Sequence, residues 1–232
     1  MTPTLSIVIP CLNEAAGIAA VLSRLAPMRG HGAEVIVVDG GSNDGSAALA
    51  ASFADRIIEA PRGRASQMNA GAFAARGEVL LFLHADCLLP VGADHLIHDG
   101  LAASGRSWGR FDVSLGGEHW LLKFVAVTMN LRSRLTGIAT GDQGLFMRRA
   151  LFVAVNGFPQ IPLMEDVAMS RQLKTHGAPL CLRERIVTSA RRWEEHGVLN
   201  TILLMWRLRL AYFLGADPAR LALRYDAVRS RN

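Results

Sequence analysis

The first part of the chain alternates short apolar runs with longer segments of helical periodicity. The runs "LSIVIP", "EVIVVDG", "RIIEA" and "EVLLFLHAD" have the length and apolar character of buried strands. Between the first two runs, Ile18, Val21, Leu22 and Leu25 recur at the spacing of one helical face. Strands that alternate with helices form βαβ units, in which helices cover both faces of a parallel sheet. The sequence therefore predicts an α/β fold with a Rossmann-like, mostly parallel sheet.

No repeat and no linker rich in Pro, Gly or Ser divides the 232 residues, so we expect a single domain. Its parts are an α/β half (1–104), a mixed segment (105–196) and a helical tail (197–232). In the mixed segment, "WGRFDVSL" alternates as an exposed or edge strand does, and residues 118–135 have an amphipathic helical pattern. "GLFMRR" predicts a further strand and "EDVAMSRQLKTHG" a helix.

Charge and composition limit the possible classes of binding partner but do not identify one. The formal charge of +5 and the pI near 9.7 suit a nucleotide, a phosphate or a lipid surface. Only 6% of the residues are aromatic and no nucleic-acid-binding module is recognisable, so nucleic acid is disfavoured. Three cysteines without a CxxC spacing indicate reduced thiols, and "MTPTLSIVIP" indicates a strand rather than a signal peptide. The reduced thiols indicate a cytoplasmic protein. No apolar stretch reaches the roughly 20 residues of a spanning helix.

Two carboxylates follow apolar runs, where the strands should end. Asp39 ends "EVIVVD" and Asp86 follows "EVLLFL". Burying an ionised carboxylate is costly unless the group is paired or binds a metal. Ligands of open α/β sheets bind at the carboxyl ends of the strands. The two acids therefore indicate a functional site at this edge of the sheet.

The segment "VVDGGSNDGS" has two interpretations. Gly40 and Gly41 let the backbone turn tightly and approach a ligand, which would make Asp39 a binding residue. An ordinary βα turn with a helix cap is the alternative, and it suits Ser42 and Asn43 better. The dinucleotide fingerprint GxGxxG is absent after the first strand, which disfavours a hydride-transfer enzyme.

In "HAD", His84 and Asp86 lie on one face of the strand because strand side chains alternate. Carboxylate oxygen suits a hard divalent cation such as Mg²⁺ or Mn²⁺, which shares its ligands with substrate phosphates. Asp86 is therefore a candidate metal ligand. His84 is either a further metal contact or a hydrogen-bonded core histidine.

Arginines mark two further segments. In "RGRASQMNAG", Arg62 and Arg64 stand at a helix start, where guanidinium and free amide groups could bind an anion. A solvated basic loop explains them equally well.

In "ARRWEEHG", Arg191 and Arg192 could clamp a diphosphate, Trp193 could pack over it and His196 could ligate a metal. The alternative is an exposed charged turn before the last helix.

Two acidic pairs could act on a substrate. Glu165 and Asp166 open a helix, where the helix dipole commonly favours acids, and could instead supply a general base at the mouth of a cleft. In "GDQG", Asp142 and Gln143 either bind a sugar or acceptor or form a polar turn before a strand.

Taken in order, these motifs resemble those of glycosyltransferase family 2, the inverting transferases with a GT-A fold. "LSIVIPCLNEAAGI" is similar to the family's opening strand and turn, and "VVDGGSNDGS" to its "VVDDGSxDGT". "HAD" is similar to the DxD-type metal motif, and "NGFPQIPLMEDVAMSRQLKTHG" to the acceptor segment "GGF…ED…R…G". The resemblance covers roughly residues 4–180 and is to short single-domain bacterial members.

The resemblance implies metal-assisted transfer of a sugar from a nucleotide-diphosphate sugar, with UDP favoured, to an acceptor hydroxyl. Residues 1–104 would bind the donor and 105–196 the acceptor. Asp166 would be the base, Glu165 would orient it or bind acceptor, and Asp86 would hold Mg²⁺ or Mn²⁺. The donor residues would be Pro10, Leu12, Glu14, Asp39, Gly41, Arg64, Ala85, Asp86, Arg191 and Arg192, and the acceptor residues Asp142, Gln143 and Trp193.

The chain departs from the family pattern at three places. Gly40 replaces the common second acid, and His84 replaces the first acid of DxD. Asp86 is then the one carboxylate ligand from its strand, and His196 is the candidate second ligand. "SARRW" lacks the Gln of QxxRW and no spanning helices follow, so we do not expect synthesis of long polymers.

The tail at 197–232 has several possible roles. A basic, amphipathic helix there could place the protein on the inner face of a membrane, near a lipid-linked acceptor. Core packing or a homodimer contact is the alternative. The competing function is a non-catalytic nucleotide-sugar-binding or membrane-docking protein with the same fold. Asp86, Asp166 and the arginines together favour an enzyme, since a sensor needs no base.

Overall fold

The computed structural model of the chain describes residues 3–229, apart from the side chains of Arg192, Glu195, His196, Asp226, Val228 and Arg229. The strands in this range are β1 (Leu5–Cys11), β2 (Glu34–Asp39), β3 (Arg56–Glu59), β4 (Val79–Phe82), β5 (Cys87–Leu88), β6 (Trp108–Leu115), β7 (Leu145–Arg148) and β8 (Leu180–Thr188). The helices are α1 (Ile18–Ser23), α2 (Ala26–Gly30), α3 (Ser46–Ala50), α4 (Arg64–Ala74), α5 (Ala93–Ser104), α6 (Trp120–Thr136), α7 (Arg149–Ala154), α8 (Glu165–Lys174), α9 (Arg191–His196), α10 (Val198–Phe213) and α11 (Pro218–Arg229), with a 3-10 turn, η1 (Gly141–Gln143).

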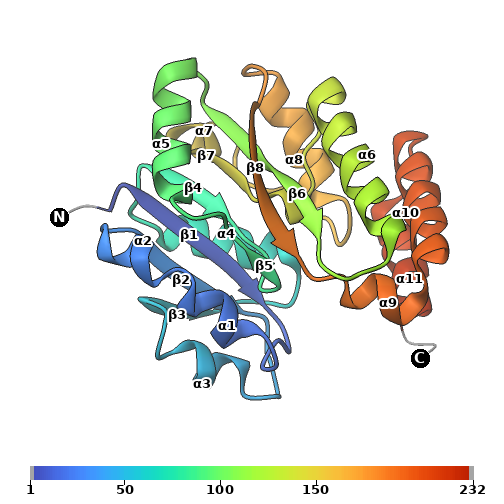
Figure 1. Cartoon of the computed structure of the whole chain (residues 1–232), viewed down its shortest axis with the longest axis horizontal. Helices are drawn as coiled ribbons and strands as arrows, with labels where there is room; N and C mark the ends of the chain where they lie inside the picture. The colour runs from blue at the N-terminus through green and yellow to red at the C-terminus, as the bar shows by residue number, and fades with distance from the viewer. Residues whose placement is uncertain (1–2, 230–232) are drawn as a thin grey trace.

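The strands form one curled sheet in the order β3-β2-β1-β4-β7-β6-β8-β5, packed between helices (Figure 1). β3, β2, β1 and β4 pair in parallel, with Cys11 opposite Asp39. β7 is antiparallel to both β4 and β6 and so joins the two halves of the sheet. The predicted Rossmann-like α/β fold is confirmed. Its topology brings the carboxyl ends of β2, β1 and β4 to one edge.

Successive residues of the parallel strands enter opposite cores. Ile7 and Ile9 of β1 belong to the core under α1, α2 and α5, whereas Val8 packs with Met68 of α4. Burial on both faces explains why these strands read as continuous apolar runs. At Gly71 of α4, an added Cβ would lie 2.4 Å from Val8 Cγ1, so this glycine allows α4 to lie close against β1.

β6 is not the exposed or edge strand that its alternating pattern predicts. It lies between β7 and β8, and its first six residues are buried. Its polar face is covered by α6: Arg110 is 0% exposed and pairs with Asp112, which also accepts a 2.7 Å hydrogen bond from Arg134. The prediction was wrong because a buried ion-pair network has the same period as a solvated strand face.

The helical tail packs onto the domain. α10 and α11 are separated at Gly215, and their residues Leu208, Leu221 and Tyr225 pack with Leu163 ahead of α8. This packing places the tail beside the sheet edge that carries the predicted site residues (Figure 1). Among residues 3–229, no helix combines the length and apolar character needed to cross a bilayer.

Candidate functional site

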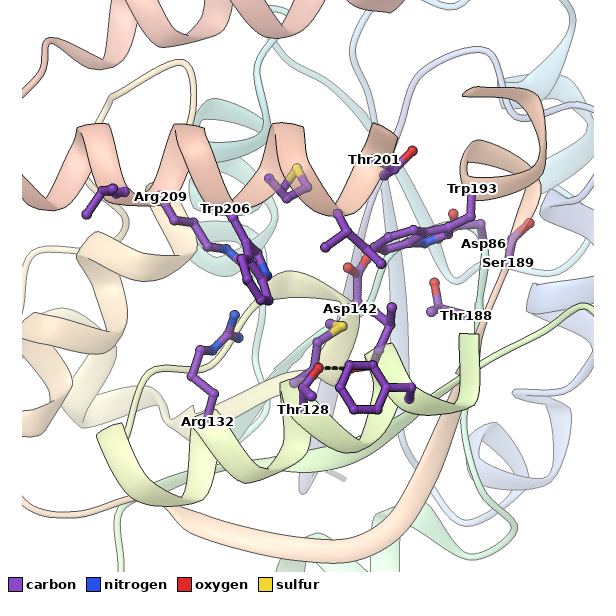
Figure 2. Close-up of a pocket in the computed structure, with 16 residues that line it drawn as sticks. Asp86, Thr128, Arg132, Asp142, Thr188, Ser189, Trp193, Thr201, Trp206 and Arg209 are labelled. Atoms are coloured by element: carbon purple, nitrogen blue, oxygen red, sulfur yellow. Dashed lines mark hydrogen bonds between the residues drawn. The ribbon is translucent and has the colours of Figure 1, made fainter. Parts of the chain in front are cut away.

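Two cavities of different chemistry open beside the carboxyl ends of β1 and β4. A polar cavity of about 290 Å³ lies against β1, the start of α4 and α11. An apolar cavity of about 490 Å³ lies between α6 and α10 (Figure 2). Asp86 lines both cavities, so the two spaces meet at this carboxylate.

The polar cavity collects most of the residues predicted for a donor. Besides Asp86, its lining includes the predicted residues Pro10, Leu12, Glu14, Arg64, Ala85 and Arg191. Residues from both ends of the chain, such as Pro10 and Arg191, therefore line the same cavity. The order of the strands alone does not predict this. Asp39 and Gly41, predicted for the same side, are not among its lining residues.

Asp39 holds the loop that follows β2. Its Oδ2 accepts hydrogen bonds from the backbone N–H groups of Gly41 at 3.0 Å and Ser42 at 2.9 Å, and its Oδ1 accepts one from the Ser42 hydroxyl. The side chain is 5% exposed. These contacts match the βα turn of the second interpretation of "VVDGGSNDGS" but not its helix cap, because the N-cap of α3 is Gly45, which has no side-chain hydrogen bond.

Gln67 is a lining residue that the sequence did not single out. Its Nε2 donates to the carbonyl oxygens of Cys11 and Val38, each at 2.8 Å, and so joins α4 to the carboxyl ends of β1 and β2. It is 3% exposed. The sequence carries no distinct signal for this role, because Gln67 stands in a helix of mixed composition beside Met68 and Asn69.

Arg64 lies at the first position of α4 and faces Glu165 at the first position of α8, with 3.8 Å between Nη1 and Oε1. Burial disfavours its charge, but Glu165 and, more weakly, Tyr225 and other acids outweigh burial and raise the pKa of Arg64. Burial and the neighbouring Asp166 raise the pKa of Glu165, while Arg64 opposes that rise. The guanidinium therefore stays charged beside the polar cavity.

Arg191 closes the polar cavity from the opposite side. Its Nη2 lies 3.2 Å from Glu14 Oε2, an ion pair that joins α9 to the loop after β1. The predicted partners Arg192 and His196 stand on the same helix, but their side chains lie outside the described residues. Tyr225 of α11 also lines this cavity, and no motif in the tail predicted it.

At the end of β4, ligand atoms of His84, Asp86 and Cys87 lie within 4.8 Å of one another. Burial raises the pKa of the Cys87 thiol well above its usual range, and thiolate sulfur suits softer metals than Mg²⁺ or Mn²⁺. An imidazole and a carboxylate remain. Carboxylate oxygen suits Mg²⁺ or Mn²⁺, and imidazole nitrogen is more typical of transition metals, so this donor set fits a divalent cation.

The η1 turn brings a second acid to the junction. Asp166 Oδ2 accepts a hydrogen bond from the N–H of Gly141 at 2.9 Å and so fixes the turn, but Asp166 itself is not among the lining residues of either cavity. Asp142, the next residue, lies 3.2 Å from His84 Nδ1 and lines the apolar cavity. Gln143 is 0% exposed and caps η1 through Thr140, so the structure does not bring it to the cavity.

The apolar cavity has one acidic and one basic end. Asp86, Thr188 and Ser189 lie together at one end, and Arg132 and Arg209 at the other (Figure 2). Trp193, predicted for an acceptor, lines the wall between them. Its remaining walls are mostly apolar side chains of α6 and α10, among them Phe124, Val125, Met129, Ile202, Met205 and Trp206.

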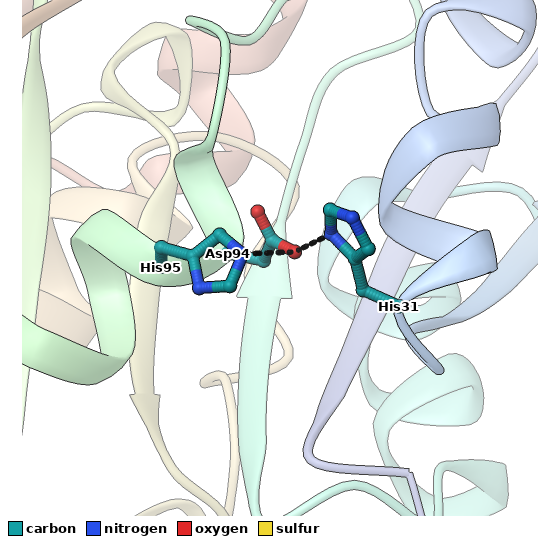
Figure 3. Close-up of side chains that lie close together, drawn as sticks. All are labelled: His31, Asp94 and His95. Carbon is teal, nitrogen blue, oxygen red and sulfur yellow. Dashed lines mark hydrogen bonds and ion pairs between the residues drawn. The ribbon is translucent and has the colours of Figure 1, made fainter.

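A second group of possible ligands, His31, Asp94 and His95, lies close together (Figure 3), and none of the three lines either cavity. Asp94 Oδ2 lies 2.8 Å from His31 Nδ1 and 3.9 Å from His95 Nε2. His31 precedes β2, so the cluster lies at the amino edge of the strands, opposite Asp39. The contact joins α5 to the loop between α2 and β2, and we assign it a role in stability.

The sequence was compared with known families and proteins. The family model described as "Glycosyl transferase family 2" matches residues 6–151. A "PGL/p-HBAD biosynthesis glycosyltransferase" of Mycobacterium bovis is 40% identical over a match that covers 36% of this chain and 36% of that protein. The match therefore spans about a third of the length of this relative.

Solved structures share the fold at lower identity. Staphylococcus aureus TarS 1-349 in complex with UDP has a TM-score of 0.66 at 16% identity, covering 80% of this chain and 60% of that one. The mannosyltransferase PcManGT from Pyrobaculum calidifontis, in complex with GDP-Man and Mn²⁺, has a TM-score of 0.65 at 20% identity, covering 100% and 71%. The fold seen in Figure 1 is thus that of GT-A glycosyltransferases.

Proposed function

The chain belongs to glycosyltransferase family 2, and from this membership we propose that it transfers a sugar from a nucleotide-diphosphate sugar to an acceptor hydroxyl. The observation that carries the proposal is the position of Asp86 in both cavities. A donor in the polar cavity and an acceptor in the apolar one would place their reacting groups together at this carboxylate. Enzymes gain much of their rate from holding two reactants in such proximity.

The polar cavity suits a nucleoside diphosphate. Arg62, Arg64 and Arg191 line it, and guanidinium groups bind phosphate oxygens through paired, charge-assisted hydrogen bonds. The apolar side chains of Pro10 and Leu12 line the same space, where a nucleoside would lie. A UDP-sugar is our favoured donor, supported by the TarS complex with UDP. Because PcManGT was solved with GDP-Man, donors with other nucleotide bases are tested as well.

His84 and Asp86 would hold the divalent cation that fits their donor set, Mn²⁺ or Mg²⁺. When bound, such a cation offsets the negative charge that develops on the departing diphosphate. His196 remains the proposed further ligand from α9. Arg64 would add its own charge to the same leaving group, and Glu165 would position Arg64 through their ion pair.

The acceptor hydroxyl would lose its proton to Asp166 and attack the anomeric carbon on the face opposite the nucleotide. A carboxylate has about four acceptor positions, so Asp166 keeps some free while it holds the N–H groups of Gly141 and Val167. Attack on that face inverts the configuration of the sugar. Asp142, at the junction, would hydrogen-bond the acceptor and hold His84 in place.

The test is donor binding followed by turnover. UDP-, GDP-, dTDP- and CDP-sugars are screened by thermal shift, each with and without Mn²⁺. We expect one of them to raise Tm by an amount that grows with its concentration. Arg64→Met should abolish that shift, whereas Arg106→Met, outside the cavity, should not. If no nucleotide sugar shifts Tm, the proposal is wrong; if one binds but its nucleotide is never released, the non-catalytic alternative holds.

We also propose that α6 and α10 rest on an anionic lipid surface. Each helix presents a row of apolar side chains, every one at least 50% exposed, spaced three or four residues apart. These apolar stripes are Trp120, Phe124, Val127, Leu131 and Leu135 on α6, and Leu199, Leu203, Trp206, Leu210 and Phe213 on α10. Exposed Lys123 and Arg207 on the same helices suit anionic headgroups.

Flotation with phosphatidylglycerol vesicles tests this surface. Leu131→Glu with Leu203→Glu should abolish flotation, because a charge on each stripe opposes insertion. Val153→Glu is the matched control, since Val153 on α7 is 62% exposed and lies outside the stripes. If the double variant instead converts a dimer to a monomer on size exclusion while wild type never floats, the stripes form a homodimer contact.

A further inference from the structure

Arg132 and Arg209 share the basic end of the apolar cavity. Arg132 extends from α6 and Arg209 from α10, toward the same space between the two helices (Figure 2). The Nε and Nη2 atoms of Arg132 are buried and have no hydrogen-bond partner within the described part of the chain. Buried guanidinium groups are normally paired, because leaving such a charge without a partner is costly. A bound anion would therefore stabilise the arrangement of Arg132 and Arg209.

The charges around the two side chains agree with this geometry. Burial and, next, the like charge of Arg209 lower the pKa of Arg132 to about 10, although Asp166 and Asp142 act in the opposite direction. Burial also lowers the pKa of Arg209. Both groups remain charged near neutral pH and repel each other. A negatively charged group between them would relieve both the repulsion and the lost hydration.

The cavity beyond the arginines specifies the rest of the ligand. An adjoining apolar cavity of about 430 Å³ shares Arg132 and Arg209 and adds Arg171 and Lys174, so positive charge is concentrated at this end. From there the 490 Å³ cavity runs between apolar side chains of α6 and α10 to Asp86. A ligand that fills it has an anionic group at one end, an apolar body and a polar group at the other end.

We propose that the acceptor is an amphiphilic acid whose carboxylate or phosphate group binds between Arg132 and Arg209. Its apolar body lies between α6 and α10, and its hydroxyl reaches the acidic end at Asp86. This inference rests on the proposed transferase function, because it names the acceptor class of the same site. Guanidinium groups suit both acids, since each offers two oxygens to the planar fork of an arginine.

Three probes of equal chain length test the site: decanoate, decyl phosphate and decanol, each below its micelle concentration. Trp193 and Trp206 line the cavity, so their fluorescence reports binding without any nucleotide. We expect the two acids to bind about 10- to 100-fold more tightly than decanol, the range for hydrogen bonds to a charged group. Tighter binding of the phosphate assigns a phosphate acceptor, and tighter binding of decanoate a carboxylate.

Arg132→Met with Arg209→Met should remove the preference for the acids and leave decanol binding within a few-fold of wild type. Arg207→Met is the matched control, because it removes an exposed arginine from the same helix and should keep the preference. Without ligand, Arg132→Met should keep or raise Tm, since it removes an unpaired buried charge. A structural role would lower Tm instead.

The inference is overturned if decanol binds as tightly as the acids, or if the double variant behaves like Arg207→Met. Neither result bears on nucleotide binding in the polar cavity. A preference for acids without any nucleotide-induced shift would overturn the transferase and leave the anion site. A nucleotide-induced shift without a preference for acids would overturn the anion site and leave the transferase.

Discussion

Replacing Asp166 by asparagine removes the proposed base and keeps its shape. Asp166 Oδ2 accepts the N–H of Gly141 at 2.9 Å, and an amide oxygen can accept the same hydrogen bond, whereas the amide NH₂ group cannot accept the N–H of Val167 as Oδ1 does. The η1 turn and Asp142 should therefore keep their places. Asp166 does not line the polar cavity, so the variant should still bind the donor.

The expected effects on stability and on chemistry differ in size. A hydrogen bond to a charged group contributes about 1.5–3 kcal/mol and a neutral one about 0.5–1.5 kcal/mol, so neutralisation costs about 1–1.5 kcal/mol. Loss of a charge from the first turn of α8 costs about 0.3–1 kcal/mol more. Together these lower the free energy of unfolding by roughly 1.5–2.5 kcal/mol, or Tm by about 3–10 °C. Loss of a general base lowers kcat by about 10²–10⁴-fold.

The assay measures release of nucleoside diphosphate from the donor that shifts Tm, with an added hydroxylated acceptor, together with Tm in each variant. We expect Asp166→Asn to be folded, to keep the donor-induced shift and to lose turnover. Asp99→Asn, an exposed acid of α5, is the control for charge alone. Turnover within tenfold of wild type, or a larger loss in Asp142→Asn than in Asp166→Asn, would refute the assignment of Asp166 as the base.

Three further predictions follow from buried contacts. Gln67→Leu removes the side-chain donor to two carbonyl oxygens, of which that of Cys11 still accepts the N–H of Gly40, and should lower the free energy of unfolding by about 1–3 kcal/mol in urea titrations; a loss below about 0.5 kcal/mol would contradict the joining role of Gln67. Burial alone would raise the pKa of Asp94, but its hydrogen bond with His31 and the charge of His95 lower it. This stabilisation is present above the ordinary aspartate pKa, near 4, and is lost as pH falls through the lower folded value, so below about pH 4 wild type should lose more Tm than Asp94→Asn. Burial raises the pKa of Cys11 to about 11 and that of Cys87 well above its usual range, so iodoacetamide at pH 7.5 should label half-buried Cys181 first, as mass spectrometry can check.

The parallel half of the sheet follows from the sequence because its signals are local. Strands buried on both faces must be apolar throughout, and helices that cover them must repeat every three or four residues. "LSIVIP", "EVIVVD" and "EVLLFL" satisfy the first rule, and Ile18, Val21 and Leu22 the second. The order of the motifs then predicted the family and placed Asp86 at a strand end.

Periodicity failed where polar residues are buried. Arg110 and Asp112 alternate with apolar neighbours as on a solvated strand, yet α6 covers them and they pair with each other and with Arg134. β8 has half-buried and exposed residues in its first part and no clear pattern, so its place beside β6 depends on pairing with a distant strand. Such pairing leaves no signal in either segment alone.

By itself the sequence determined the fold class, the family and the acids at the strand ends, because each depends on residues close together in the chain. Tertiary structure decided which of them share a space. It brought Arg191 to Glu14 and Tyr225 to the polar cavity, and it left Asp39 within its own loop. It also set Arg132 and Arg209 against one another, from helices that are separated in the chain by β7, α7, α8, β8 and α9. Contacts between distant segments depend on how the helices pack over the sheet, and packing is a property of the whole chain.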